Sequence, residues 1–199
     1  MPRTVTVLGH GSARAVPDSA VVRVAAAHRA PTVAQAVAGV DSAVAAIGRV
    51  ARGLSEVTTV ATTGLSVWPW RDAGAPGAPE PEGFEASHQL RIRCPNLPEA
   101  SALVVGLAEE VGDRLRIEGV QLEVSDETGA RDAAREAAWS DARRRATHLA
   151  GLDGATLGDL LEVAEDDAGG PGPGVFLATT LEPGETTITA RVRVTWQLL

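Results

Sequence analysis

An alanine at every fourth position of one segment is the feature that most limits how this chain folds. Residues four apart lie on the same side of a helix, and the series falls at Ala130, Ala134, Ala138, Ala142, Ala146 and Ala150. Ala133, Ala137 and Leu149 widen this stripe, and the opposite side of the segment is charged. Because an alanine methyl fills little volume, a dense core requires this helix to lie very close to its partner. We therefore predict a helix over about 128–150, packed closely on a sheet or on another helix.

Two further helices are indicated by their start signals. Thr32 and Gln35 have the spacing of a capping box, and Asn96 with Glu99 marks a second helix start. Apolar residues follow the first start at steps of three and four, as in an amphipathic helix: Val33, Val37, Val40, Val44, Ile47, Ala51 and Leu54. We expect Gly53 to end that helix. The second helix is expected to bury Leu103, Val104, Leu107 and Val111.

Alternation of apolar and polar residues predicts the strands. They are expected at 3–8, 20–28, 57–70, 84–94, 114–125, 156–165 and 187–198. A change of parity at Gly119 indicates a β-bulge. The runs 57–70 and 84–94 are expected to pair as one long hairpin. The segments 71–83 and 166–184, rich in Pro and Gly, are predicted to be flexible loops.

These elements give the order β-β-α-β-β-α-β-α-β-β. Hairpins mix with crossover connections, which is typical of an α+β fold. We expect one mostly antiparallel sheet with the helices packed on one face. A chain of 199 residues is long enough for a substantial core, and we predict a single domain over residues 1–199.

The charge balance and the cysteine content restrict the function classes. The formal net charge is −8, which argues against nucleic-acid binding because such proteins present a basic face to the phosphates. Cys94 is the only cysteine, so no disulfide can form within the chain. Neither a signal-peptide core nor an apolar window of the roughly 20 residues that span a bilayer is evident. We expect a soluble, cytoplasmic protein without direct membrane insertion.

No motif in the sequence predicts catalysis, a cofactor or a metal site. The segment GHGSARA, from Gly9, resembles a dinucleotide-binding loop, but such a loop must open a helix, and Pro17 and a β-rich run follow here. We interpret this segment as a turn. The four histidines (His10, His28, His88 and His148) have no metal-ligand spacing. His88 and Cys94 face inward on one strand about 20 Å apart, too far for shared chemistry, and are expected to be core residues.

Two apolar elements are candidates for an interface. Trp68 and Trp70 flank Pro69 at the end of a strand, where they are expected either to anchor an interface or to pack in the core. Val175, Phe176 and Leu177 form an apolar triplet inside a loop rich in Gly and Pro. Such a triplet requires burial against this chain or a neighbour.

Several stretches, in order and over nearly the whole chain, resemble the SIMPL-domain family. They are GHGSARAVPDSAVVRV, TTGLSVWPW, the Ala-rich helix with the following strand (ARDAAREAAWSDARRRATHLAGLDGATLGDLLEV) and the closing PGETTITARVRVTWQL. Two positions depart from the family pattern: His10 stands where an acidic residue is usual, and Arg145 where Lys is frequent. The resemblance implies an α+β fold and an expectation of self-association. The family has no agreed chemistry, is mostly exported and is associated with envelope stress responses.

Together these observations predict a non-enzymatic, self-assembling scaffold or binding protein, a homo-oligomer with an unknown ligand. A second hypothesis is a small-molecule binding module with a pocket between the Ala-rich helix and the sheet. An enzyme would need a cleft that gathers His10, His88 or Cys94 with a carboxylate.

Overall fold

The computed structural model describes residues 3–71, 82–166 and 184–199, and it has the predicted α+β order of elements. They are β1 (Thr4–Ala15), β2 (Ser19–Ala30), α1 (Val33–Leu54), β3 (Thr59–Arg71), β4 (Glu82–Cys94), α2 (Leu97–Val111), the 3-10 turn η1 (Gly112–Arg114), β5 (Leu115–Glu123), α3 (Thr128–Leu152), β6 (Leu157–Asp166) and β7 (Thr186–Leu198).

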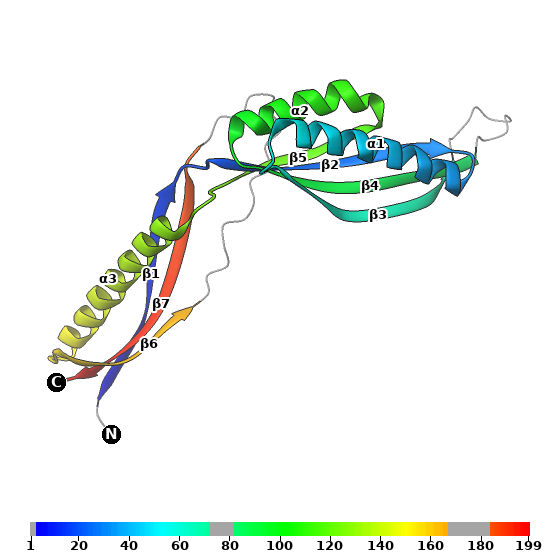
Figure 1. Cartoon of the computed structure of the whole chain (residues 1–199). Helices are drawn as coiled ribbons and strands as arrows, with labels where there is room; N and C mark the ends of the chain where they lie inside the picture. The colour runs from blue at the N-terminus through cyan, green and yellow to red at the C-terminus, as the bar shows by residue number, and fades with distance from the viewer. Residues whose placement is uncertain (1–2, 72–81, 167–183) are drawn as a thin grey trace. The chain divides into compact units, whose positions relative to one another are not determined.

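The described strands form two antiparallel sheets, where the sequence analysis expected one (Figure 1). Contacts within the chain divide it into two compact units. Unit 1 contains β1, α3, β6 and β7, and unit 2 contains β2 to β5 with α1 and α2. That residues 1–199 act as one domain stays a prediction.

Unit 1 is a three-stranded sheet with one helix on it. The strand order is β1-β7-β6, and α3 lies along β1 and β7 (Figure 1). The alanine stripe faces the sheet as predicted, and its buried members are Ala134, Ala138, Ala142, Ala146 and Ala150. Trp139 of α3 contacts Trp196 of β7, with 5.8 Å between the ring centroids. The close helix packing that the alanines predicted is therefore confirmed.

The GHG segment is not a turn, and this interpretation was wrong. Gly9 and Gly11 lie inside β1, which continues to Ala15. A Cβ atom at Gly9 would lie 2.1 Å from the backbone oxygen of Ala138, and one at Gly11 would lie 2.0 Å from that of Ala134. No side chain fits at such distances, so glycine is required here because the α3 backbone rests directly on the strand.

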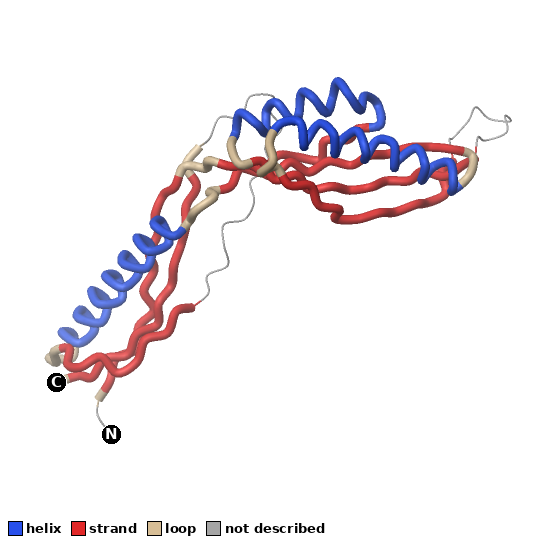
Figure 2. The backbone as a smooth tube through the Cα atoms, viewed as in Figure 1, coloured by secondary structure: helices blue, strands red, loops and turns tan. Residues whose placement is uncertain are grey.

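Unit 2 is a four-stranded sheet in the order β3-β4-β2-β5, with α1 and α2 on one face (Figure 2). The succession β-α-β-β-α-β with this order is the ferredoxin-like arrangement. The predicted hairpin is present, because β3 pairs with β4. The bulge is present too: the register between β2 and β5 shifts beside Gly119. The core lies between the sheet and the two helices and includes Val22, Val24, Ile47, Ile92 and Leu103.

The helix starts agree with the sequence analysis. Thr32 accepts a hydrogen bond from the Gln35 amide, and Asn96 accepts one from the Glu99 amide. Helix α1 ends at Leu54, one residue beyond Gly53. By length and composition α1 could cross a membrane, which the sequence analysis did not expect. Core helices share these properties, and α1 has six residues buried in the unit: Ala36, Val40, Ala43, Ala46, Ile47 and Ala51.

Candidate functional site

The outer edge of β1 is closed by side chains of α3. An edge strand presents free N–H and C=O groups that invite another strand to pair. Here the amide of His10 donates to the Asp141 carboxylate at 3.1 Å, and Arg145 donates to the carbonyl of Leu8 at 3.4 Å. Arg144 also pairs with Asp141. The middle of β1 is thereby occupied, and strand pairing is blocked there.

These contacts also set the ionisation of Asp141. The hydrogen bond from the His10 amide lowers the pKa of this carboxyl below its usual range, and Arg145 and Arg144 lower it further against the opposing effect of burial. The carboxylate therefore stays ionised and keeps holding the strand edge.

The other edge of unit 1, strand β6, is open within the described residues. No other described strand pairs with its outer side. Three large apolar residues are about half exposed on it: Leu160 at 47%, Leu161 at 50% and Val163 at 49%. Its four acidic residues, Asp159, Glu162, Glu165 and Asp166, are exposed as well. An open edge that carries exposed apolar side chains is typical of a binding surface.

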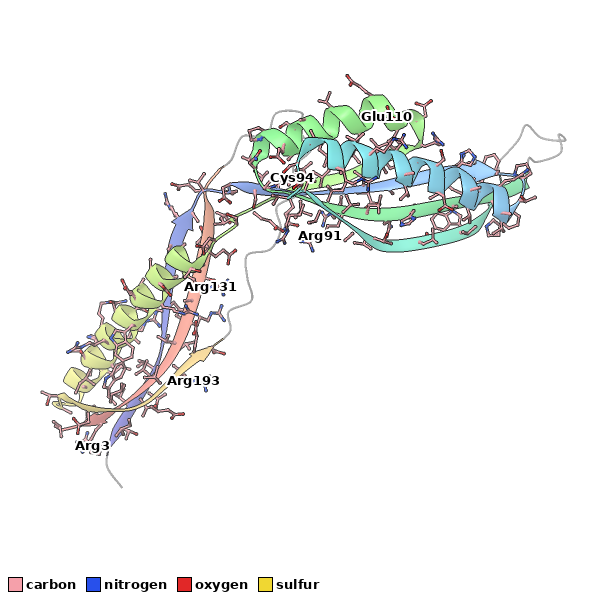
Figure 3. The ribbon with its side chains drawn as sticks, viewed as in Figure 1. Arg3, Arg91, Cys94, Glu110, Arg131 and Arg193 are labelled. Atoms are coloured by element: carbon pink, nitrogen blue, oxygen red, sulfur yellow. The ribbon has the colours of Figure 1, made fainter. Side chains whose placement is uncertain are left out.

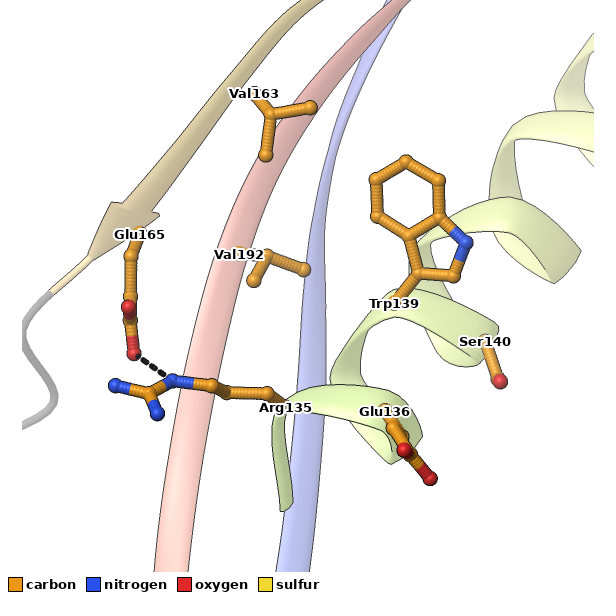
Figure 4. Close-up of a pocket in the computed structure, with 7 residues that line it drawn as sticks. All are labelled: Arg135, Glu136, Trp139, Ser140, Val163, Glu165 and Val192. Atoms are coloured by element: carbon orange, nitrogen blue, oxygen red, sulfur yellow. Dashed lines mark hydrogen bonds and ion pairs between the residues drawn. The ribbon is translucent and has the colours of Figure 1, made fainter. Parts of the chain in front are cut away.

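A groove of about 560 Å³ lies between α3 and β6 (Figure 4). It arises because α3 covers β1 and β7 and makes few contacts with β6. Trp139 forms one wall, Val163 the other, and the buried Val192 lies between them. The remaining lining residues are Arg135, Glu136, Ser140 and Glu165. We call this set of seven residues the β6 groove.

A hydrogen-bonded ion pair bridges the β6 groove at one end. Arg135 donates to Glu165 at 2.8 Å, and it also pairs with Asp132 at 3.0 Å. The bonds to Glu165 and Asp132 raise the pKa of the Arg135 guanidinium. The groove therefore has an apolar middle and a charged end, a combination that suits a ligand or peptide with an apolar side chain.

The tryptophans of the predicted interface lie on the helix-free face of unit 2. Trp68 is 42% exposed, so it is not a core residue. Trp70 is half-buried, and the Arg29 guanidinium lies 4.5 Å from the centre of its ring. The second predicted element, Val175, Phe176 and Leu177, lies outside the described residues.

Beside Trp68, a buried carboxylate joins two arginines. Glu85 is 4% exposed and accepts hydrogen bonds from Arg29 at 2.5 Å and from Arg116 at 2.9 Å. Burial raises the pKa of Glu85, but the two arginines outweigh this effect and the pKa lies below its usual range. Glu85 is therefore a buried carboxylate whose hydrogen bonds are satisfied, and its bonds to Arg29 and Arg116 link β4 to β2 and β5.

The histidines and the cysteine do not gather into one site. Cys94 is buried, and burial raises the pKa of its thiol to about 11, with a contribution from Glu99. His88 faces the same helix-covered side and its Nε2 lies 2.8 Å from the Thr62 hydroxyl. His10 and His148 both line an open hollow beside β1. Over residues 3–71, 82–166 and 184–199, no three His, Cys, Asp or Glu side chains are placed to share a metal ion.

Comparison with solved structures gives weak likenesses. An amidase of the hydantoinase/carbamoylase family from Burkholderia phymatum has a TM-score of 0.33 and 15% identity, over 59% of this chain and 30% of the amidase. An amidase of the same family from Burkholderia vietnamiensis has a TM-score of 0.34 and 16% identity, over 64% and 33% of the two chains. This chain thus spans about a third of each neighbour, and such scores support no statement about activity. No curated protein sequence matches it.

The family comparison covers far more of the chain. The sequence model of SIMPL, described as a protein of unknown function (DUF541), matches residues 5–196. The match includes both units and both edges described above, and it agrees with the ordered motifs from Gly9 to the last strand. The chain therefore belongs to the SIMPL family.

Proposed function

We propose that this SIMPL-family chain is a non-enzymatic scaffold protein that assembles with copies of itself through open sheet edges. The observation that carries the proposal is the contrast between the two edges of unit 1. Asp141 and Arg145 occupy the backbone groups in the middle of β1, whereas no described strand pairs with the outer edge of β6, which exposes Leu160 and Val163. A chain that only needed to avoid aggregation would close both edges.

Strand β3 of unit 2 is the second edge that supports the proposal. It is thirteen residues long, and Val60, Leu65 and Val67 are exposed on its helix side. Trp68 is exposed on the opposite side. Pro69 is tolerated because an edge strand has one side free of ladder hydrogen bonds. Together, β3 and β6 supply two apolar edges for contacts between copies.

Light scattering after gel filtration tests this proposal. We expect a mass above that of one chain at micromolar concentration, and a strictly monomeric protein over that range would refute the proposal. Val163→Lys and Leu160→Lys should lower the mass, because each places a charge in the contact while leaving the fold intact at a half-exposed site. Val105→Lys, at an exposed valine on α2, is the matched control and should keep the wild-type mass.

The interface predicted from the sequence is tested in the same experiment. Trp68→Ala should lower the mass, and so should Phe176→Ala, whose site lies outside the described residues. An unchanged mass in both variants would remove these two residues from the interface. The mass of the β6 variants would still decide whether β6 takes part.

The β6 groove favours one alternative, a small-molecule binding module. Trp139 and Val163 present apolar surface beside the Arg135–Glu165 ion pair, which suits a small ligand with an apolar body and a polar group. A ligand of this kind would raise the melting temperature of the wild type and not of Trp139→Ala. A broad metabolite screen without any shift would contradict this alternative.

A further inference from the structure

The helix-free face of unit 2 carries a group of arginines at one end. Arg23 of β2 lies directly opposite Arg91 of β4 in the register, and Arg93 follows two residues later on the same face. Their neighbours Val22, Val24 and Ile92 point into the core on the helix side, so the three arginines point away from it. Figure 3 shows Arg91 on the side of the sheet away from α1 and α2. We call Arg23, Arg91 and Arg93 the arginine triad.

The arginine triad pairs with fewer carboxylates than it has guanidinium groups. Glu123 of β5 pairs with Arg91 and Arg93, at 3.3 Å each. Arg23 makes no ion pair with any carboxylate in the described part of the chain, although it is half-buried. Glu85 lies six residues before Arg91 on β4 and is occupied by Arg29 and Arg116. The three guanidinium groups and Glu123 together carry a formal charge of +2.

Such an arrangement is unfavourable without a counter-charge. Like charges directly opposite each other on a sheet destabilise the pairing, and a half-buried charge without a partner loses solvation. Neutral residues at positions 23 and 91 would avoid both costs. The triad is therefore better explained by an anion that it binds than by the stability of the sheet.

We propose that the arginine triad is a binding site for the dianion of a phosphate monoester. A monoester carries close to two negative charges at neutral pH, which balances the charge of the triad with Glu123. Guanidinium groups match phosphate oxygens in paired hydrogen bonds, and adjacent strands present Arg23 and Arg91 from two sides. A phosphodiester carries one charge per phosphate and fits the site less well.

Calorimetric titration of the full chain with inorganic phosphate and with phenyl phosphate tests the proposal, at constant ionic strength set with sodium chloride. Arg23→Gln should weaken binding about tenfold, the loss expected for a hydrogen bond to a charged group. Arg49→Gln is the control, because Arg49 of α1 pairs with Glu110 away from this face. No saturable binding to the wild type, or equal binding by Arg23→Gln, would overturn the proposal.

A second variant separates binding from a structural role. Glu123→Gln removes the carboxylate that competes for Arg91 and Arg93, so phosphate should bind several-fold more tightly. If these side chains only hold the strands together, the same change would loosen the site, and weaker binding would contradict the proposal. Far-UV circular dichroism of each variant confirms that the sheet is intact.

Two further measurements distinguish a phosphate monoester from other anions: the pH dependence of its affinity and a comparison with a phosphodiester chain. The affinity for phenyl phosphate should fall below about pH 6, where the dianion of the monoester takes up a proton, while sulfate affinity should stay level. A single-stranded oligothymidylate should bind no more tightly than phenyl phosphate. Tighter binding of the oligothymidylate, or an affinity for phenyl phosphate that does not change with pH, would refute the assignment to a monoester dianion.

Discussion

Substitution of Gly11 by alanine is the sharpest test of the packing in unit 1. The new Cβ atom would lie 2.0 Å from the oxygen of Ala134 and 2.3 Å from the nitrogen of Ala138. Both are backbone atoms of α3, so no side-chain rotation relieves the clash. An ordinary contact begins at 3.4 Å, and α3 must therefore move away from β1 by about 1.4 Å.

The cost follows from what this movement disturbs. The five buried alanines of α3 are Ala134, Ala138, Ala142, Ala146 and Ala150. A buried methyl contributes about 0.8 kcal/mol, and a gap of this size forfeits about half of the contact energy, so packing loses about 2 kcal/mol. The hydrogen bonds that join Asp141 and Arg145 to β1 would lengthen, and each loss would cost about 1 kcal/mol. We expect Gly11→Ala to lower the free energy of unfolding by about 3–4 kcal/mol.

Guanidinium unfolding followed by tryptophan fluorescence measures this loss. Trp139 and Trp196 report on unit 1, and changing Trp68 and Trp70 to Phe in both proteins removes the signal of unit 2. Gly129→Ala, in the first turn of α3 with open space around it, is the control and should gain up to about 1 kcal/mol. If Gly11→Ala unfolds at the same denaturant concentration as its parent, the inferred contact between α3 and β1 is wrong.

Three further predictions follow from the buried and hydrogen-bonded groups. Glu85→Gln should lower the free energy of unfolding by about 2 kcal/mol, because Arg29 and Arg116 lose their shared carboxylate, and denaturant titration measures it. Asp141 has a lowered pKa in the folded state, so its contribution is complete above the unfolded pKa, near 3.8, and is lost as the pH falls through the lower folded value. The stability difference between wild type and Asp141→Asn should therefore shrink over that interval, and a difference independent of pH would contradict the assignment. Cys94, buried with its pKa raised to about 11, should react with a thiol reagent only after unfolding, and rapid reaction of the native protein would show that the thiol is accessible.

The sequence predicted the elements of this fold better than their arrangement. Periodicity located the three helices and seven strands of the described residues, because each depends on local spacing. The division into two sheets depends on which strands pair, and alternation within one strand carries no information about its partner. Gly9 and Gly11 were misread because glycine is depleted in strands. These two positions require glycine because α3, more than a hundred residues later, packs against them. In the sequence, only the alanine stripe of α3 indicated this close contact.

The candidate site was predicted only in part. Trp68 was expected either to anchor an interface or to pack in the core, and its exposure excludes the core, while its role in an interface stays a prediction. The β6 groove was missed, because it depends on α3 covering β1 and β7 instead of β6. A local signal existed in the segment 157–166, where Leu160, Leu161 and Val163 lie among four acidic residues. The arginine triad required the register between β2 and β4, which the sequence does not supply.

The charges on the open edges restrict how copies can associate. Like charges that face each other across paired strands are unfavourable. Two β6 strands that paired with each other would bring together their exposed acidic residues, which are Asp159, Glu162, Glu165 and Asp166. Strand β3 contains no acidic residue, so it is the better partner for β6. Pairing of β6 with β3 joins different surfaces of two copies, and such contacts extend into rings or filaments instead of stopping at a dimer. Assembly should therefore exceed two copies at neutral pH, and acid conditions that neutralise the carboxylates would allow the symmetric pairing to compete.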